Sequence, residues 1–201
     1  MFLIPRRQIW TQQPQGAVEI DWQTSRDFGI SEVYLGSSPG RLLVGGAVPT
    51  RSASIVDIVS DKGKAASFNA VNGESIRIGT TADAVLGSAA TTIAILRRCR
   101  DTTNRASELF AYDDGVSNRC LAHAPYSDGN AYWDFANPDA GSGRLSVAYT
   151  KDTAWETLVF VAGQSKGREI WRRSIRIANN AAAKAVRPAS VQPLLLGADV
   201  T

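Results

Sequence analysis

Short runs of β-branched, aromatic and alternating residues recur along this chain, and clusters of Gly, Asn, Asp, Ser and Pro separate them. Residues 75–78 and 174–177 alternate polar with apolar side chains, as half-buried strands do. Residues 158–161 are continuously apolar, which suits a central strand covered on both faces. We expect strands at residues 17–22, 30–35, 54–59, 75–78, 91–97, 108–112, 131–135, 145–149, 157–162, 169–171, 175–178 and 193–196.

About a dozen short strands at this spacing predict an all-β chain folded as an antiparallel sandwich or barrel. No stretch shows the 3.6-residue period of an amphipathic helix. Residues 179–186 are rich in alanine, but Pro188 and Pro193 follow at once, so we interpret them as a loop.

The first sixteen residues differ from the rest, with two prolines, four glutamines and no sheet-like alternation. We expect an extended amino-terminal arm at 1–16, followed by one β-sandwich domain at 17–201. The arm either packs Ile9 and Trp10 on its own domain or docks on another subunit. The docking residues of the second alternative are Pro5, Arg6, Arg7 and Trp10.

The chain of 201 residues is 44% hydrophobic and 20% charged, which suits a globular domain and excludes intrinsic disorder. Its net charge is +3, and the excess is uneven, because the stretch 164–187 has seven bases against Glu169 alone. Such an end could steer the chain onto another copy or an acidic scaffold, with Arg172, Arg173 and Arg176 as docking residues. Nucleic acid is not expected, because only Trp171 interleaves with these bases.

Cys99 and Cys120 match no metal-binding spacing. They are either buried small hydrophobes in a reducing compartment or a pair bridging neighbouring strands. No secretory signal is visible in this sequence and no apolar run approaches the ~18 residues of a membrane span, so we expect neither. We therefore expect synthesis in the host cytoplasm and no membrane partner.

The sequence offers no strong catalytic or metal-binding pattern. His123 is the only histidine, which excludes a histidine triad or multi-histidine metal site within one chain, and we expect a structural role. Glu19, Asp21 and Gln23 alternate as on one strand face, but the general acid of a Glu-x-Asp-x-Glu glycosidase strand would stand at position 23, and Gln23 cannot donate that proton. We expect no enzymatic activity, no cofactor and no metal.

Aromatic residues gather between positions 126 and 135, where they either fill the core or stack on sugar rings. Tyr126 lies in a Pro–Tyr–Ser–Asp–Gly turn and is the one most expected to be exposed. The candidate glycan-binding residues are Tyr126, Asp128, Asn130 and Trp133.

Residues 91–178 resemble the laminin-G-like, concanavalin A-like lectin and glucanase jelly roll. The resemblance rests on a first strand at 91–98, a Pro–aromatic–Ser–Asp–Gly hairpin within 119–135, a tryptophan strand at 154–161 and a hairpin at 169–175. Residues 69–78 resemble the opening strand of that family. The implied fold is an antiparallel jelly-roll β-sandwich.

Three departures from the family pattern are visible. The last hairpin turn reads Arg172-Arg173-Ser174 in place of an Asn-Gly type, and Thr157 replaces a histidine. We expect the strand that usually closes the sheet beside the first strand to be missing after Gly197. Either residues 28–34 take its place or a sheet edge is left for a partner.

The arm also resembles the opening of laminin-G-like proteins encoded by tailed bacteriophages, which are typically virion components. This implies a non-enzymatic structural protein of the virion, attached to the capsid as a decoration, cement or head-fibre protein. Its partners would be other virion proteins, from capsid or tail, and further copies of itself. The alternative is a carbohydrate-binding module of a phage tail or host-attachment protein, with a host glycan as ligand.

Overall fold

The computed structural model describes residues 34–35, 41–42, 50–69, 73–78, 90–106, 109–113, 119–136, 143–163, 167–181 and 194–197. The chain divides into two units, Met1–Ser31 and Glu32–Thr201, and every described residue belongs to the second. None of the described residues lies in a helix, and so none of them forms a helix that could cross a membrane.

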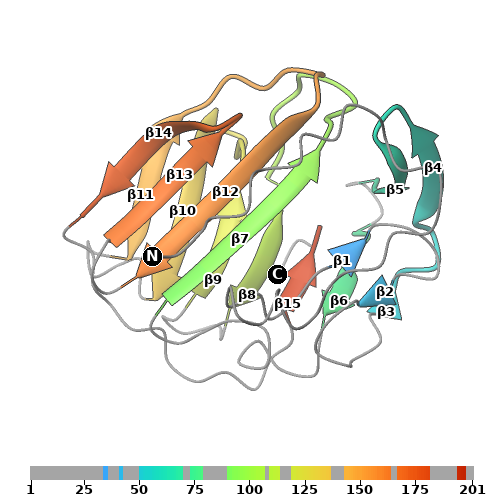
Figure 1. Cartoon of the computed structure of the whole chain (residues 1–201), viewed down its shortest axis with the longest axis horizontal. Coiled ribbons are helices and arrows are strands. Elements are labelled where there is room, and N and C mark those ends of the chain that lie inside the picture. The colour runs from blue at the N-terminus through green and yellow to red at the C-terminus, as the bar shows by residue number, and fades with distance from the viewer. Residues whose placement is uncertain are drawn as a thin grey trace, which may run out of the picture. The chain divides into compact units, whose positions relative to one another are not determined.

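The described residues form fifteen strands (Figure 1). They are β1 (Tyr34–Leu35), β2 (Arg41–Leu42), β3 (Thr50–Arg51), β4 (Val56–Ser60), β5 (Gly63–Ser67), β6 (Ile76–Ile78), β7 (Ala90–Arg97), β8 (Phe110–Asp113), β9 (Arg119–His123), β10 (Asn130–Ala136), β11 (Arg144–Ala148), β12 (Glu156–Gly163), β13 (Gly167–Arg172), β14 (Ile175–Asn180) and β15 (Leu194–Leu196).

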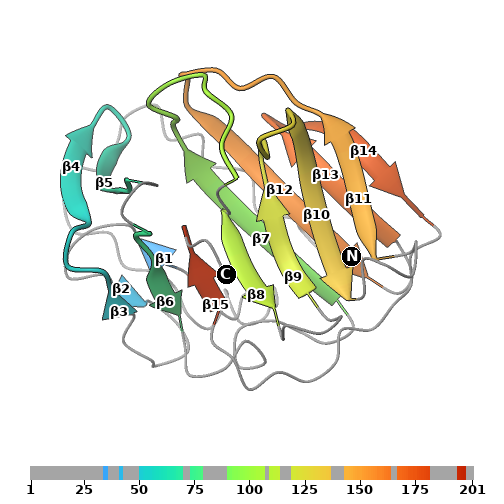
Figure 2. The ribbon, with the colours of Figure 1, turned by 180° about the vertical axis from the view of Figure 1, so that it is seen from behind.

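Two sheets form the body of this unit. The seven-stranded sheet has the order β11-β10-β9-β8-β15-β6-β3, and the four-stranded sheet has the order β14-β13-β12-β7. Every pairing is antiparallel, and β1–β2 and β4–β5 form two further hairpins. Figure 1 shows the four-stranded sheet in front of β8–β11, and Figure 2 shows both layers from behind. The chain is an all-β antiparallel sandwich, as its pattern predicts.

Trp133 lies at the centre of the core between the two sheets and is 0% exposed. Its ring lies 5.8 Å from the Phe160 ring of the opposite sheet and 5.7 Å from the Phe135 ring. Its Nε1 donates a hydrogen bond of 2.8 Å to the Val161 carbonyl, which satisfies the one polar atom of the indole. Removing such a buried aromatic typically costs about 3–5 kcal/mol.

The strand pattern of the sequence is largely confirmed, with local differences. β12 is central in its sheet, between β7 and β13, but Val159 and Val161 on its outer face are only half-buried. In β14, Ile175 is 67% exposed, although the alternation predicts a buried side chain. A register shift between Ile170 and Trp171 changes how β14 pairs, and side-chain direction depends on that register.

The strand predicted at residues 193–196 is confirmed as β15, which lies between β6 and β8, with Leu194 as the register partner of Ile78. The residues after Gly197 lie outside the described ones, so the expectation that a further closing strand is missing there stays a prediction. Gly197 follows with φ +76, and a Cβ there would lie 2.7 Å from the Phe68 ring.

His123 is buried in β9, which lies between β8 and β10 rather than at a sheet edge. Cys120 is buried, Cys99 is partly exposed and no disulfide joins them, so the bridging pair is wrong and only Cys120 is a buried small hydrophobe. The arm 1–16, the expected strand 17–22, the Glu19–Gln23 segment and residues 182–186 lie outside the described residues.

The turn between β13 and β14 is the most unusual backbone feature of the sandwich. Arg173 has φ 50 and Ser174 has φ 68, so both residues adopt the left-handed conformation of a type I′ hairpin turn. That conformation costs about 1–2 kcal/mol for a residue with a Cβ atom. Neither residue is the glycine or asparagine that such a turn prefers.

We expect the substitution Ser174→Gly to stabilise the protein by about 1 kcal/mol, because it removes the Cβ clash of a left-handed residue. The melting temperature should rise by about 2–4 °C for a domain of this size. Thermal unfolding followed by circular dichroism measures it, with Ser174→Ala as the control that retains the clash. A lower melting temperature for the glycine variant would contradict the strain argument.

Candidate functional site

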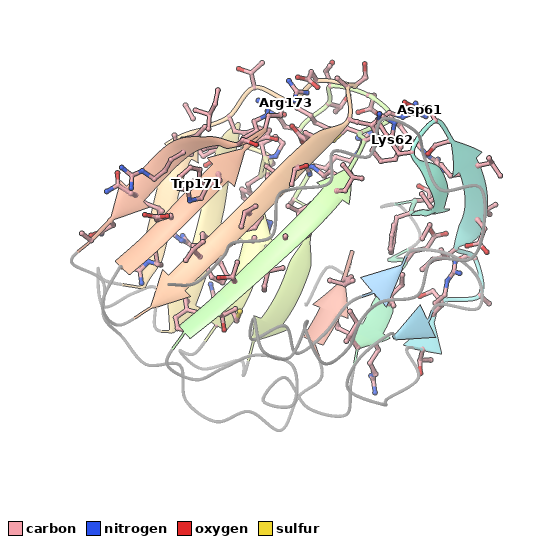
Figure 3. All side chains as sticks on the ribbon, in the orientation of Figure 1. Asp61, Lys62, Trp171 and Arg173 are labelled. Atoms are coloured by element: carbon pink, nitrogen blue, oxygen red, sulfur yellow. The ribbon has the colours of Figure 1, made fainter. Side chains whose placement is uncertain are left out.

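Five short segments meet at one end of the sandwich, and we call them together the loop end. They are residues 61–62, 98–106, 124–129, 149–155 and 173–174. Lys151 Nζ donates to the Thr103 carbonyl over 2.6 Å, and the Tyr149 amide donates to the Gly129 carbonyl over 2.9 Å. Asp61, Lys62 and Arg173 are labelled at this end in Figure 3.

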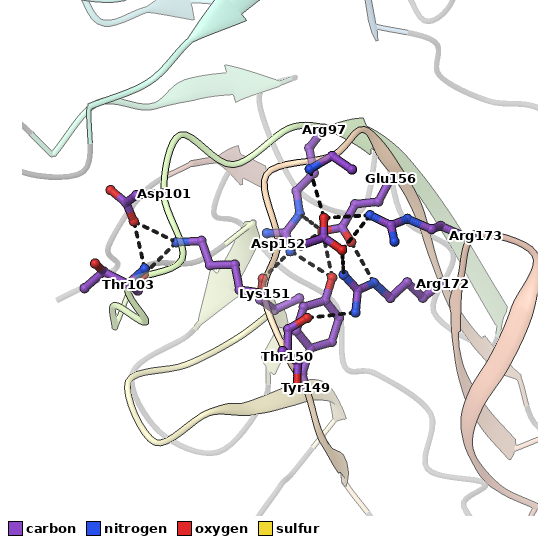
Figure 4. A network of polar contacts seen from close by, with 12 residues as sticks. Arg97, Asp101, Thr103, Tyr149, Thr150, Lys151, Asp152, Glu156, Arg172 and Arg173 are labelled. Carbon is purple, nitrogen blue, oxygen red and sulfur yellow. Dashed lines mark hydrogen bonds and ion pairs between the residues drawn. The ribbon is translucent and has the colours of Figure 1, made fainter.

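A buried carboxylate organises the loop end. Glu156, with a side chain only 1% exposed, accepts hydrogen bonds from Arg97 Nε over 2.8 Å and Arg172 Nε over 2.7 Å. The Tyr149 hydroxyl donates to the same carboxylate over 2.7 Å (Figure 4). Arg97 also donates to the Ala124 carbonyl. One acidic side chain on β12 therefore links β7, β13 and two loops.

A second carboxylate extends this network to the surface. Asp152 accepts from Arg172 Nη2 over 3.0 Å and from Arg173 Nη2 over 2.7 Å (Figure 4). Arg172 Nη1 donates to the Thr150 carbonyl over 2.8 Å. Arg172 thus bridges Glu156, Asp152 and a backbone oxygen, which leaves its guanidinium little capacity for a partner.

The predicted docking arginines are not gathered into one patch. Arg172 and Arg173 pair with Asp152 at the loop end, whereas Arg176 lies on β14 and pairs with Glu169. Pro5, Arg6, Arg7 and Trp10 of the predicted arm lie outside the described residues.

The network shifts two pKa values in opposite directions. The hydrogen bond from Arg173 is the largest effect that lowers the pKa of Asp152, followed by the bond from the Ala154 amide. Burial raises the pKa of Tyr149 well above its usual range, and the hydrogen bond to Glu156 adds to it. Tyr149 therefore remains a protonated donor at any physiological pH.

Next to this network, an exposed aromatic corner follows β9. Tyr126 is 36% exposed, and its ring lies 4.8 Å from the His123 ring and 6.0 Å from the Tyr132 ring. Asp128 accepts from the Tyr132 hydroxyl and, over 2.9 Å, from the Asn130 amide. The Tyr132 hydrogen bond is the largest effect that lowers the pKa of Asp128.

Three of the four candidate glycan-binding residues, Tyr126, Asp128 and Asn130, lie together in this corner. The fourth, Trp133, is wrong as a sugar contact, because its indole is buried in the core. Its neighbour Tyr132 points to the opposite face of β10, where its hydroxyl donates to Asp128 of the corner. The two-residue period of a strand was the signal that separates neighbours 132 and 133.

Sequence reasoning missed Glu156, Arg97 and Tyr149, which carry the network. Glu156 sits in an otherwise apolar strand, and nothing local marks it as buried rather than exposed. Among the described residues, no group of three or more His, Cys, Asp or Glu side chains could hold a metal ion.

Comparisons with known proteins give a likeness of fold. No family model matches the chain, and no curated protein matches it. The binding domain of Paraclostridial Mosquitocidal Protein 1 is similar, with a TM-score of 0.62 and 13% identity. The match covers 85% of this chain and 44% of that one, so this chain spans less than half of its length.

A second structure, Rv0315, a pseudo β-1,3-glucanase of Mycobacterium tuberculosis, matches with a TM-score of 0.33 and 10% identity. That match covers 79% of this chain and 78% of the other. At such low identity, the comparison with the toxin domain supports the β-sandwich fold and nothing finer.

We expect Glu156→Gln to destabilise the protein by about 3 kcal/mol, because it leaves two partly buried arginines without their shared counter-charge. The melting temperature should fall by roughly 6–12 °C. Urea unfolding of the variant beside Asp101→Asn, which changes an exposed carboxylate of the same loop end, measures the difference. An equal decrease in the free energy of unfolding in both variants would show that the buried carboxylate stabilises the protein no more than the exposed one.

Proposed function

We propose that this chain is a non-enzymatic structural protein of a bacteriophage particle, attached to the capsid as a decoration, cement or head-fibre protein. One observation about the site supports the proposal that the protein is not an enzyme. Both oxygens of Glu156 are occupied by Arg97, Tyr149 and Arg172, so this buried carboxylate is a structural anchor rather than an acid or base. The loop end is then a preformed surface rather than a reaction centre.

The particle setting rests on the sequence resemblance of the arm and of residues 91–178. In this proposal the arm 1–16 is the assembly element, and the sandwich is the folded body that it attaches. The partners are other virion proteins and further copies of the chain. The protein is made in the host cytoplasm and ends in the virion.

A second candidate function is carbohydrate binding on a tail or host-attachment protein. The specific observation that favours it is the exposed corner, where the Tyr126 ring stands beside the Asp128 carboxylate and the Asn130 backbone. An aromatic ring covers the apolar face of a sugar, and a carboxylate accepts its hydroxyl hydrogens.

The first candidate predicts that deletion of residues 1–16 leaves the melting temperature within a few degrees of the intact protein but abolishes incorporation into particles. The extended arm can reach as far as ~50 Å, which suits a tie between subunits. Mass spectrometry of purified particles, with the intact chain as control, measures incorporation. If the truncated chain unfolds or assembles normally, the arm is a strap on its own domain or is dispensable.

The second candidate predicts saturable binding on a glycan array that Tyr126→Ala weakens by about tenfold or more, because the ring supplies the stacking surface. Arg105→Ala is the matched control, since it alters an exposed side chain of the loop end outside the corner. Binding that is absent, or that Tyr126→Ala leaves unchanged, would contradict a glycan site at this corner.

A further inference from the structure

The outer face of the four-stranded sheet is a second surface that the functions above leave unexplained. Leu158 of β12 is buried in the core, so its neighbours Thr157 and Val159 point to the other side. The register places Leu96 opposite Thr157 and Trp171 opposite Val159. Leu96 is 56% exposed, which shows that this face is open to solvent.

Near the loop end, this face carries an arginine held on an indole ring. The Arg98 guanidinium lies 5.4 Å from the centroid of the Trp155 ring. Trp155 Nε1 donates to Asp61 Oδ1 over 2.7 Å, which fixes the orientation of the ring. Arg98 makes no hydrogen bond or ion pair with the rest of the described residues.

The same arrangement recurs further along the face. The Arg176 guanidinium lies 5.8 Å from the centroid of the Trp171 ring, and Trp171 Nε1 donates to Glu169 Oε2 over 2.7 Å. Arg176 Nη1 donates to Glu169 Oε1 over 3.0 Å. Figure 3 labels Trp171 over this sheet, away from the loop end that Arg173 marks.

The two arginine–tryptophan pairs stand at a fixed spacing. Trp155 directly precedes β12, four residues before Val159, and Trp171 is the register partner of Val159 on the next strand. At strand spacing this puts the two Cα atoms about 14 Å apart. Thr157 lies between them with an exposed side chain. The face is therefore a short, straight track with a guanidinium at each end.

This track is rich in donors and poor in available acceptors. The oxygens of Asp61 and Glu169 already accept from the two indoles. Within the described residues, the Arg98 guanidinium makes no hydrogen bond or ion pair, and Arg176 donates to Glu169 through Nη1 alone, which leaves donors on both for a ligand. Lys62 adds an ammonium group with a 53% exposed side chain, 3.8 Å from Asp61. A complementary ligand must supply acceptor oxygens and negative charge.

The size of the face limits what can bind it. Four strands about 4.8 Å apart and six to eight residues long cover roughly 450 Å². A stable contact between two copies of the chain needs about 800 Å² from each. The face therefore suits a narrow, extended ligand rather than a second copy of the chain.

We propose that this outer face binds a linear polysaccharide that carries carboxylate groups. Arg98 and Arg176 each bind one carboxylate, Trp155 and Trp171 hold the guanidiniums in place, and the Thr157 hydroxyl bonds to a sugar hydroxyl between them. Single-stranded nucleic acid is disfavoured, because an arginine already lies over each indole ring on which a base would stack. The proposal rests on the second candidate function and places its acidic ligand on the sheet rather than at the Tyr126 corner.

Isothermal titration of the full chain with size-defined oligogalacturonates tests this, with dextran oligomers of equal length as neutral probes. Arg98→Ala and Arg176→Ala should each weaken oligogalacturonate binding by about tenfold or more, because a charge-assisted hydrogen bond is lost. Arg105→Ala, which removes an exposed arginine of the loop end, should leave the affinity unchanged. Melting temperatures confirm that each variant is folded, and Arg98→Lys should retain part of the affinity.

The outcomes separate this inference from the function on which it rests. If Tyr126→Ala abolishes binding while both arginine variants bind normally, carbohydrate binding stands and the sheet-face site is overturned. Failure to bind any acidic oligomer, or equal binding of dextran, also overturns it. Tighter binding of oligo-dT or polyglutamate than of oligogalacturonate overturns the assignment of a polysaccharide ligand.

Discussion

The position of the loops depends on one buried carboxylate. Glu156 sits at the start of β12, where the core gives way to the loop end, and two arginines from the flanking strands converge on it. A charge taken out of water is tolerated only when its partners compensate for the lost hydration, so these side chains have little freedom to move independently. The loops that contact Arg97, Tyr149 or Arg172 are therefore held in place by the same carboxylate.

Pairing between arginines and carboxylates within the domain also determines which basic side chains remain available to a partner. The arginines nearest one another in sequence, Arg172 and Arg173, are neutralised by Asp152 within their own domain. Arg98, distant in sequence from that pair, lies on the Trp155 ring and makes no ion pair with an acid among the described residues. Counting charges along a sequence locates the excess, but folding decides which charges remain available to a partner.

Strand positions were predictable because they follow from a local period. Ile76 and Ile78 are buried with Arg77 exposed between them, as their alternation indicates. Contacts across the fold were not predictable in this way: Arg97 and Arg172 lie 59 and 16 residues from Glu156. Likewise, nothing in the sequence near Leu194–Leu196 says that the strand inserts between β6 and β8. The two-residue period puts Tyr132 and Trp133 on opposite faces of β10, but only the packing of the two sheets shows which face is the core.

The insertion of β15 imposes an order on biosynthesis. Leu194 is paired with Ile78, and the strand also borders β8, so the seven-stranded sheet has a gap in its middle until these late residues have been made. While the ribosome is still adding residues, β6 and β8 both present unpaired backbone groups to solvent. The sheet therefore completes only after translation has passed Leu196, and until then a chaperone or a neighbouring nascent chain can occupy the vacant slot.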